Sequence, residues 1–503
     1  MAYQESRYMP PRRFTYVFCA LISVLSSLAL LKYAGFGPIY VLFAILSNAL
    51  LYFGFRRNAI FFDTFIGILF WLGFWLKLTF RVAFMDGQFH EAVGNFDGSG
   101  AAFDRALLVA ACGFLGLLAA SFIREKYMFT YPAKLTEVAQ EGLIKAYQNH
   151  RRAVLFGFAI LFVTVAVTNF YFGIYQRGSI PRTVLPYGLG ATYSWLLLFG
   201  LASISALILH FEFTLNRKTS YPVVIISLLE GFLTNVSLLS RGMIINVSAL
   251  GYGVIRSLKF YSIKSNYRFW AVSFLIFIIV FGISVVLVQH LRFIDPRALE
   301  SIDFSDLRSP ADLWRLLVSK LHLNDMKIVT IGRGAQVLVI DRWVGIEGVM
   351  AVSSYPKQGW DLWSEAWKET HSHKMSFYDA NLITSPYRDI DMTKHHYISL
   401  PGILDFCFYP GSFPFLFMCM FVLGAVAAAI EISVFKLGGA NIILCALLAQ
   451  VVAYRYAHFG YAPSRSYMLF GSLYLTLFIF YFSNEFLLDW NKRKEAQIRG
   501  VST

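Results

Sequence analysis

The chain has 503 residues, of which 57% are hydrophobic, 17% aromatic and only 15% charged, with a formal net charge of +14. Soluble globular domains carry about 25% charged residues, so this composition excludes a soluble enzyme, a disordered chain and a secreted disulfide scaffold. The cysteines are few, odd in number and mostly in apolar runs, which predicts neither a disulfide framework nor a metal cluster. We therefore expect a membrane protein, and because it lacks a Walker A loop and a dinucleotide fingerprint we expect no cofactor.

About twelve apolar segments are long enough to cross a bilayer as helices. They are residues 14–31, 36–55, 59–84, 105–123, 153–175, 191–211, 221–239, 243–258, 269–290, 412–434, 438–454 and 465–483. The predicted fold is an all-α polytopic membrane protein with about twelve transmembrane helices. Residues 291–404, between the ninth and tenth helices, form one large helical periplasmic loop.

Basic residues gather in alternate connections and in the C-terminal tail. The short connections on the other side hold only Lys32, Arg177, Arg182, Arg241, Arg455 and Arg465. By the positive-inside rule both termini are cytoplasmic and the large loop lies on the opposite, outer side of the membrane. The excess positive charge then faces the inner leaflet of the bilayer, and no nucleic acid partner is implied.

Four regions follow from these segments. Residues 1–290 carry the first nine helices and include a cytoplasmic amphipathic segment, 124–152. The predicted apolar face of that segment consists of Leu135, Val138, Ala139, Leu143, Ala146 and Tyr147. Residues 291–404 form the periplasmic loop domain, 405–484 the last three helices, and 485–503 a cytoplasmic tail.

Arginine on the outer side is the strongest chemical signal. Guanidinium groups bind phosphate bidentately and keep their charge when partly buried. A set of them at the outer interface suits a polyprenyl diphosphate, although a single arginine there is commonly a snorkelling side chain at a helix end. The candidate diphosphate ligands are Arg177, Arg182, Arg241, Arg333, Arg342, Arg455 and Arg465.

The large loop supplies the other candidates. Trp360, Trp363 and Trp367 fall on one helical face, where flat rings could cover sugars or form an interfacial belt. A loop histidine or Glu347 is the candidate general base. The acids of the second outer connection, Asp86, Glu91, Asp97 and Asp104 with His90, offer another acid/base site, but scattered acids in a Gly-rich solvated loop are the commoner interpretation.

The sequence resembles the O-antigen polymerase and ligase superfamily, the Wzy polymerases and WaaL ligases. Residues 238–242, Leu-Leu-Ser-Arg-Gly, are similar to its Ser-Arg-Gly signature, and the large outer loop has the expected place. Residues 395–400, His-His-Tyr-Ile-Ser-Leu, are similar to the end of the ligase loop, although the ligase Asn is replaced and no Glu precedes Gly411.

The resemblance implies a metal-independent glycosyltransferase that polymerises undecaprenyl-diphosphate-linked oligosaccharides into O-antigen or exopolysaccharide. Arg241, with Arg342, Arg455 and Arg465, would bind the diphosphates, and Glu347 or His396 would be the base. A chain-length regulator and a flippase would be its protein partners. A ligase that moves polymer onto lipid A–core uses the same donor chemistry and is the nearest alternative.

Two other classes remain open. A lipid-linked oligosaccharide flippase would have short loops and related halves. A polyprenyl-phosphate-sugar glycosyltransferase would carry an essential acid in its first outer loop, which has none here, although Asp86 and Asp97 lie in the second.

Overall fold

The computed structural model describes residues 12–132, 140–216, 221–240, 243–260, 267–293, 337–371, 374–385, 387–388 and 396–500. Within these ranges the regular structure is helical and no strand occurs. A helix lies at each predicted membrane segment. The first six segments are α1 (Arg12–Lys32), α2 (Gly37–Gly54), α3 (Phe61–Phe70) with η1 (Trp71–Leu76) and α4 (Lys77–Phe84), α5 (Gly100–Tyr127), α6 (Glu141–Phe172), and α7 (Leu189–Trp195) with η2 (Leu196–Gly200) and α8 (Leu201–Asn216).

The later segments follow the same order. They are α9 (Tyr221–Ser237), α10 (Met243–Phe260), α11 (Tyr267–Phe293), α19 (Phe413–Leu437), α20 (Ile442–Ala457) and, after the short η6 (Pro463–Arg465), α21 (Ser466–Gly500). Nine helical stretches among the described residues are long and apolar enough to cross a membrane. This confirms a helical membrane protein, while the number of crossings stays a prediction, because α9 and α20 are shorter apolar helices.

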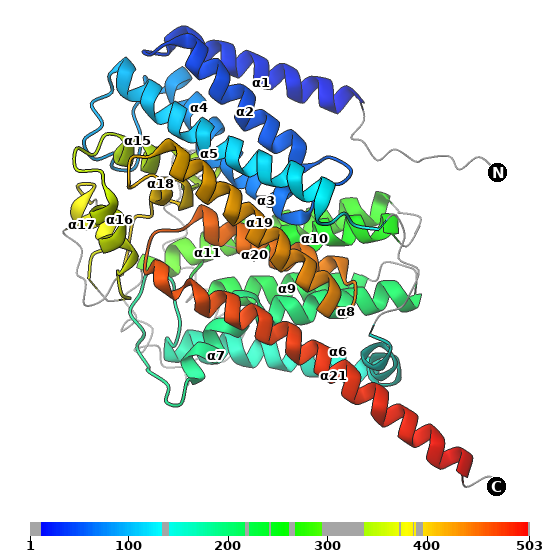
Figure 1. Ribbon diagram of the computed structural model, residues 1–503. Coiled ribbons are helices and arrows are strands. Elements are labelled where there is room, and N and C mark those ends of the chain that lie inside the picture. Colours follow the sequence, from blue (N-terminus) through cyan, green and yellow to red (C-terminus); the bar gives the residue numbers. More distant parts are fainter. Residues whose placement is uncertain are drawn as a thin grey trace, which may run out of the picture.

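The helices lie side by side in one bundle (Figure 1). α20 is its centre: it packs against α3, α8, α10 and α19, and most of its residues are buried. α1, α6, α11 and α21 bury only a small share of their apolar stretches, which is the pattern of helices that face lipid. The apolar composition of the chain is thus divided between a protein core and a lipid-facing surface.

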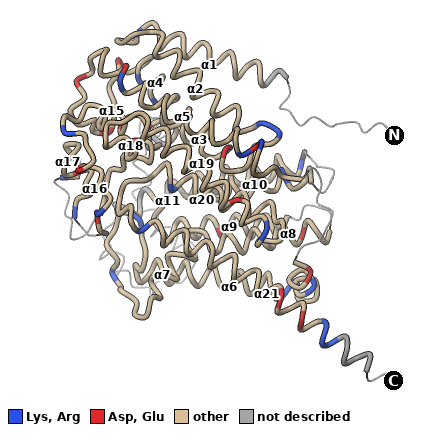
Figure 2. Tube along the Cα trace, viewed as in Figure 1, with Lys and Arg blue, Asp and Glu red and all other residues tan. Residues whose placement is uncertain are grey.

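The bundle has two distinct ends. α1 begins and α21 ends on the same side, which we call the terminal end (Figure 1). The opposite side, the loop end, carries α15 (Ile346–Ser353), α16 (Trp360–Trp367), α17 (Phe377–Asn381) and α18 (Ile403–Cys407). Lys, Arg, Asp and Glu gather toward these two ends (Figure 2). The start of α1 and the end of α21 therefore lie at one end of the bundle.

The described part of the large loop enters the helix bundle. All eight residues of α15, Ile346–Ser353, are buried. α15 packs against α5, α18 and η1, so it fills space between helices that are distant in sequence. A segment so completely buried fixes the position of the residues on either side of it.

The predicted amphipathic segment 124–152 packs partly onto the protein. α5 continues to Tyr127. α6 begins at Glu141 and is kinked at His150, so its first ten residues form a separate short helical stretch. Ile144 and Tyr147 are buried and Leu143 is half-buried, so this face packs onto the protein itself, with a hydrogen bond from Tyr147 to Glu212 (2.7 Å). The predicted Leu135, Val138 and Ala139 lie outside the described residues. α21 continues from the last predicted membrane segment through the predicted tail to Gly500.

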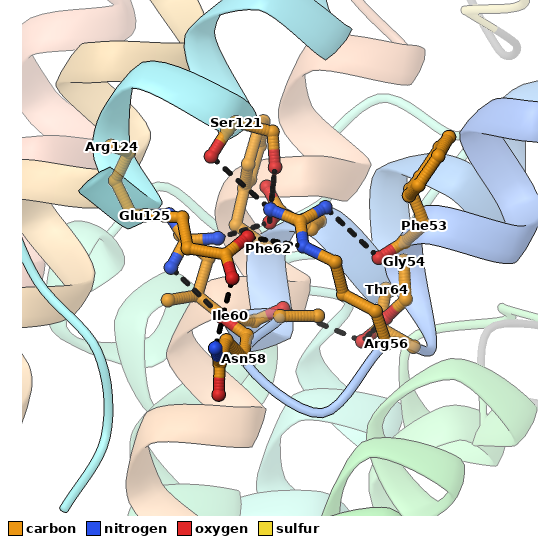
Figure 3. Close-up of polar contacts among 12 residues, drawn as sticks. Phe53, Gly54, Arg56, Asn58, Ile60, Phe62, Thr64, Ser121, Arg124 and Glu125 are labelled. Atoms are coloured by element: carbon orange, nitrogen blue, oxygen red, sulfur yellow. Dashed lines mark hydrogen bonds and ion pairs between the residues drawn. The ribbon is translucent and has the colours of Figure 1, made fainter.

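A buried charge network closes the terminal end between α2, α3 and α5 (Figure 3). Arg124 of α5 pairs with Asp63 of α3 (2.8 Å) and donates to the carbonyls of Asn58 and Phe129. Arg56 pairs with Glu125 at 2.7 Å. Each ionised group has an opposite charge or carbonyls around it, which offsets the cost of removing it from water.

We predict that Arg124→Met destabilises the folded protein by about 3–5 kcal/mol, because it leaves the largely buried Asp63 without its closest charge partner. The measurement is unfolding in detergent, by heat or by a denaturing detergent. The matched control is Arg57→Met. Arg57 is an exposed arginine in the α2–α3 connection at the same end of the bundle, and its replacement should change stability little. Equal stability of wild type and Arg124→Met would contradict the network's role.

Candidate functional site

Two buried ion pairs join α4 to the large loop at the loop end. Lys77 Nζ lies 2.5 Å from Glu347 Oε2, and their side chains are 1% and 6% exposed. One helical turn later, Arg81 binds Asp341 with both Nε and a terminal nitrogen, at 3.1 and 2.6 Å. We call these four residues the loop clamp. An isolated charge at such positions is costly, so each pair holds its two segments together.

The local backbone explains how the clamp forms. The π-helical turn η1 directly precedes Lys77, and such turns rotate the side chains that follow relative to a regular α-helix. Within η1, Gly73 meets the backbone of Val344 and Gly345, and a Cβ on either glycine would collide with the other segment. The missing side chains at Gly73 and Gly345 thus allow the loop backbone to reach the helix.

A set of cationic and titratable side chains lies next to the clamp. Its members, which we call the cationic cluster, are Arg177 from the α6–α7 connection, Arg342 from the loop, and Arg455 and His458 from the end of α20. His458 lies within reach of the charges of Arg342, Arg177 and Lys77, and Arg177 and Arg455 share Tyr175 as a neighbour. Burial, together with the nearby charges of Arg342, Arg177 and Lys77, lowers the pKa of His458 to about 3, against a hydrogen bond to the Tyr454 carbonyl that acts in the opposite direction. His458 is therefore neutral near pH 7, and its ring stacks on Tyr454 with centroids 4.0 Å apart.

Two arginines of the cluster contact neutral groups. Arg177 donates to the Tyr454 hydroxyl (3.4 Å) and lies over the Tyr454 ring. Arg455 donates to the Tyr461 carbonyl and the Ser466 hydroxyl and lies over the Phe459 ring. Within the described ranges neither guanidinium forms an ion pair. Partly buried positive charge with neutral neighbours is a site suited to an anion.

The other predicted arginines divide differently. Arg182 donates to the carbonyls of Phe170 and Tyr171, the last turn of α6, which is the role of a helix C-terminal cap. Arg465 is exposed in η6. Arg241 and Arg333 lie outside the described residues. Three residues before Arg241, the Leu238 carbonyl accepts a hydrogen bond from the backbone nitrogen of Arg177 at 2.9 Å.

His396, near the end of the large loop, contacts the α6–α7 connection and the α20–α21 connection. Its backbone donates to Gly178, next to Arg177, and its ring centroid is 5.5 Å from that of Tyr461. The Tyr461 hydroxyl contacts His371 Nδ1 at 2.7 Å. The sequence names His396 as a candidate base, and the fold puts it near the cluster and near a second histidine and a tyrosine that can share a proton.

Glu369 ties this region together. Its two carboxylate oxygens accept from the backbone nitrogens of Phe377 (2.5 Å) and Ala462 (3.1 Å), which joins the loop to the α20–α21 connection. Burial raises the pKa of Glu369, and its two backbone donors act in the opposite direction. Glu369 thus attaches the loop beside η6, in addition to the clamp on α4 and the contacts of His371 and His396.

The tryptophan stripe lies on α16 as predicted. Trp363 and Trp367 stack with centroids 5.6 Å apart, and Trp360 packs edge-on against Phe415 at the start of α19. Trp360 and Trp367 remain 57% and 42% exposed. The stripe therefore covers the loop end of α19 and still leaves the side chains of Trp360 and Trp367 partly exposed.

The acids of the second outer connection have structural partners. Asp86 pairs with Lys32 (3.2 Å), and Asp97 accepts from the Ser99 backbone, a bond that lowers the pKa of Asp97. Asp104 accepts from Tyr33 and from the Phe36 backbone, which fixes the α1–α2 turn. Glu91 differs, since burial and the nearby Glu347 raise its pKa.

Sequence reasoning missed the clamp residues Lys77, Arg81 and Asp341. A signal was present, because Lys77 and Arg81 are cations four residues apart inside the apolar segment 59–84. Their partners were not predictable, since they come from a loop more than 250 residues later in the chain.

No protein-family model matches the sequence, and searches of curated proteins and of solved structures found no similar protein. Among the described residues no group of three or more His, Cys, Asp and Glu side chains could hold a metal ion.

The low pKa of His458 predicts a pH-dependent stability. The unfolded chain takes up a proton at this histidine below about pH 6.5, whereas the folded protein does so only near pH 3. Stability from this group is thus complete above pH 6.5 and falls as the pH drops below it. His458→Gln should lose less stability between pH 7 and pH 5 than wild type, measured by thermal unfolding in detergent. The exposed His150→Gln serves as control, and identical pH profiles for wild type and His458→Gln would contradict the assignment.

Proposed function

We propose that the protein is a glycosyltransferase that polymerises undecaprenyl-diphosphate-linked oligosaccharide repeat units into O-antigen or exopolysaccharide. The proposal puts the chain in a bacterial inner membrane with the loop end facing the periplasm and both termini in the cytoplasm. It rests on the sequence resemblance and on one structural observation, the cationic cluster at the loop end.

The cluster supports the proposal by its charge and position. Arg177 and Arg455 are partly buried among neutral groups, at the end of the helices where a lipid head group would lie. A lipid diphosphate supplies the missing negative charge there, while its prenyl chain stays in the bilayer. Arginine suits this task better than lysine, because its planar group binds two phosphate oxygens at once.

The proposed reaction transfers the growing glycan from one lipid carrier to another repeat unit. The bond between the sugar anomeric carbon and the diphosphate oxygen breaks, and a bond from that carbon to an acceptor hydroxyl oxygen forms. The acceptor proton passes to a base, and undecaprenyl diphosphate leaves with the bonding electron pair. The arginines stabilise the negative charge that develops on the leaving diphosphate.

Of the two candidate bases, we assign the proton transfer to His396. A base must lie near the acceptor, and His396 is half-buried beside Tyr461 and the residue that follows Arg177, with its Nε2 3.3 Å from the Lys374 carbonyl. Glu347 already binds Lys77 and accepts the Glu91 backbone nitrogen, which leaves it little capacity for a substrate proton. The exposed parts of Trp360 and Trp367 would cover sugar rings. A chain-length regulator and a flippase would be the protein partners of the polymerase.

We predict that Arg177→Lys and Arg455→Lys each reduce polymer formation about 100-fold, because lysine keeps the charge but loses the bidentate contact. Surface polysaccharide and lipid-linked glycans are extracted from a deletion strain that carries each variant. Repeat units should accumulate singly on the carrier. Arg105→Lys, an exposed arginine at the same end of the bundle, is the matched control and should retain normal polymer.

The deletion strain itself separates the functional classes. A single repeat unit on the surface glycan, without long polymer on the carrier, supports a polymerase. Long polymer that stays on the carrier would instead identify a ligase, and repeat units trapped on the inner leaflet a flippase. Normal polymer length in both arginine variants would contradict the diphosphate role of the cluster.

A further inference from the structure

The loop clamp brackets a member of the cationic cluster. Arg342 directly follows Asp341, which Arg81 binds, and lies five residues before Glu347, which Lys77 binds. Between them, the Val344–Gly345 backbone rests on Gly73 of η1. The loop is thus fixed on both sides of Arg342.

Lys77 has no capacity left for a substrate. An ammonium group has three protons to donate, and Lys77 Nζ contacts three oxygens, the Glu347 carboxylate (2.5 Å) and the carbonyls of Trp343 (2.5 Å) and Asp341 (2.9 Å). All three belong to the same loop segment. Its position therefore serves the loop rather than a ligand.

Arg81 acts in the same way from one turn further along α4. It binds Asp341 through two nitrogens and also donates to the Gln88 carbonyl (3.1 Å), in the connection that follows α4. The Arg81 side chain is 9% exposed and that of Asp341 3%. Arg81 thus binds the side chain of Asp341 at the start of the loop segment, and Lys77 binds the backbone carbonyls of Asp341 and Trp343.

We propose that Lys77 and Arg81 are positioning residues that hold Arg342 in the cationic cluster, and that Glu347 is the counter-charge of Lys77 rather than a proton acceptor. What Arg342 binds rests on the proposed function; where Arg342 is held does not. The clamp acts through the loop, so its loss alters the ligand affinity of a protein that is still folded.

The test replaces both charges of a pair at once. Lys77→Met with Glu347→Met leaves no unpaired charge, and apolar replacement of a buried pair commonly preserves stability. The double variant removes the bonds to Asp341 and Trp343, so it separates folding from positioning. Arg81→Met with Asp341→Met tests the second pair. Lys32→Met with Asp86→Met, an exposed pair at the same end, is the matched control.

The first readout is binding of undecaprenyl diphosphate to the purified protein in detergent. Arg342→Ala and the Lys77→Met/Glu347→Met variant should each weaken binding about tenfold, the scale of one lost charge-assisted contact. The variant that combines Arg342→Ala with Lys77→Met/Glu347→Met should bind no more weakly than Arg342→Ala alone, because both changes remove the contact of Arg342 with the diphosphate. Additive losses, or an unchanged affinity in the double variant, would overturn the inference.

The second readout does not depend on the ligand. With Arg342→Cys as reporter, alkylation by a water-soluble maleimide is timed in membranes, and the protein without the reporter serves as blank. Adding Lys77→Met/Glu347→Met should raise the rate about tenfold as the segment is released, a change typical of local opening, whereas Lys32→Met/Asp86→Met should not. An unchanged rate would overturn the clamp. A faster rate in a protein that does not bind undecaprenyl diphosphate would uphold the clamp and overturn the proposed function.

Discussion

A lysine inside an apolar helix must find an opposite charge within the protein, because the bilayer offers none. Lys77 finds Glu347 and two carbonyls, all on one segment of the large loop. This requirement draws the loop into the bundle, where α15 is buried throughout. The arrangement of the loop end depends on that pairing, since Arg342, the α15 core and the attachment of the loop to η1 all lie within a few residues of it.

Most of the fold could be predicted from the sequence. Apolar runs of about 20 residues predict spanning helices from bilayer thickness alone, and a helix lies at each predicted run. Local patterns also predicted the Trp360–Trp367 helix. In the predicted amphipathic segment 124–152, Tyr147 packs onto the protein and donates a hydrogen bond to Glu212, a contact between distant parts of the sequence that a local pattern does not predict.

The site was less predictable, for a physical reason. The outer arginines could be named from charge asymmetry, but their roles depend on neighbours. Arg182 caps α6, whereas Arg177 meets Tyr454 from the other end of the sequence. Lys77 and Arg81 were missed because a window average tolerates a few charges in an apolar run. Their partners Glu347 and Asp341 are fixed only by tertiary contact.

The central claim is that the loop end holds a lipid diphosphate, and photocrosslinking tests it most directly. A polyprenyl diphosphate with a photoreactive group next to the head group is irradiated with the protein in membranes, and the labelled peptides are mapped by mass spectrometry. The account predicts saturable labelling of the peptides that carry Arg177, Arg342 and Arg455, with competition by undecaprenyl diphosphate. Labelling confined to the terminal end, around Arg56 and Arg124, would contradict it.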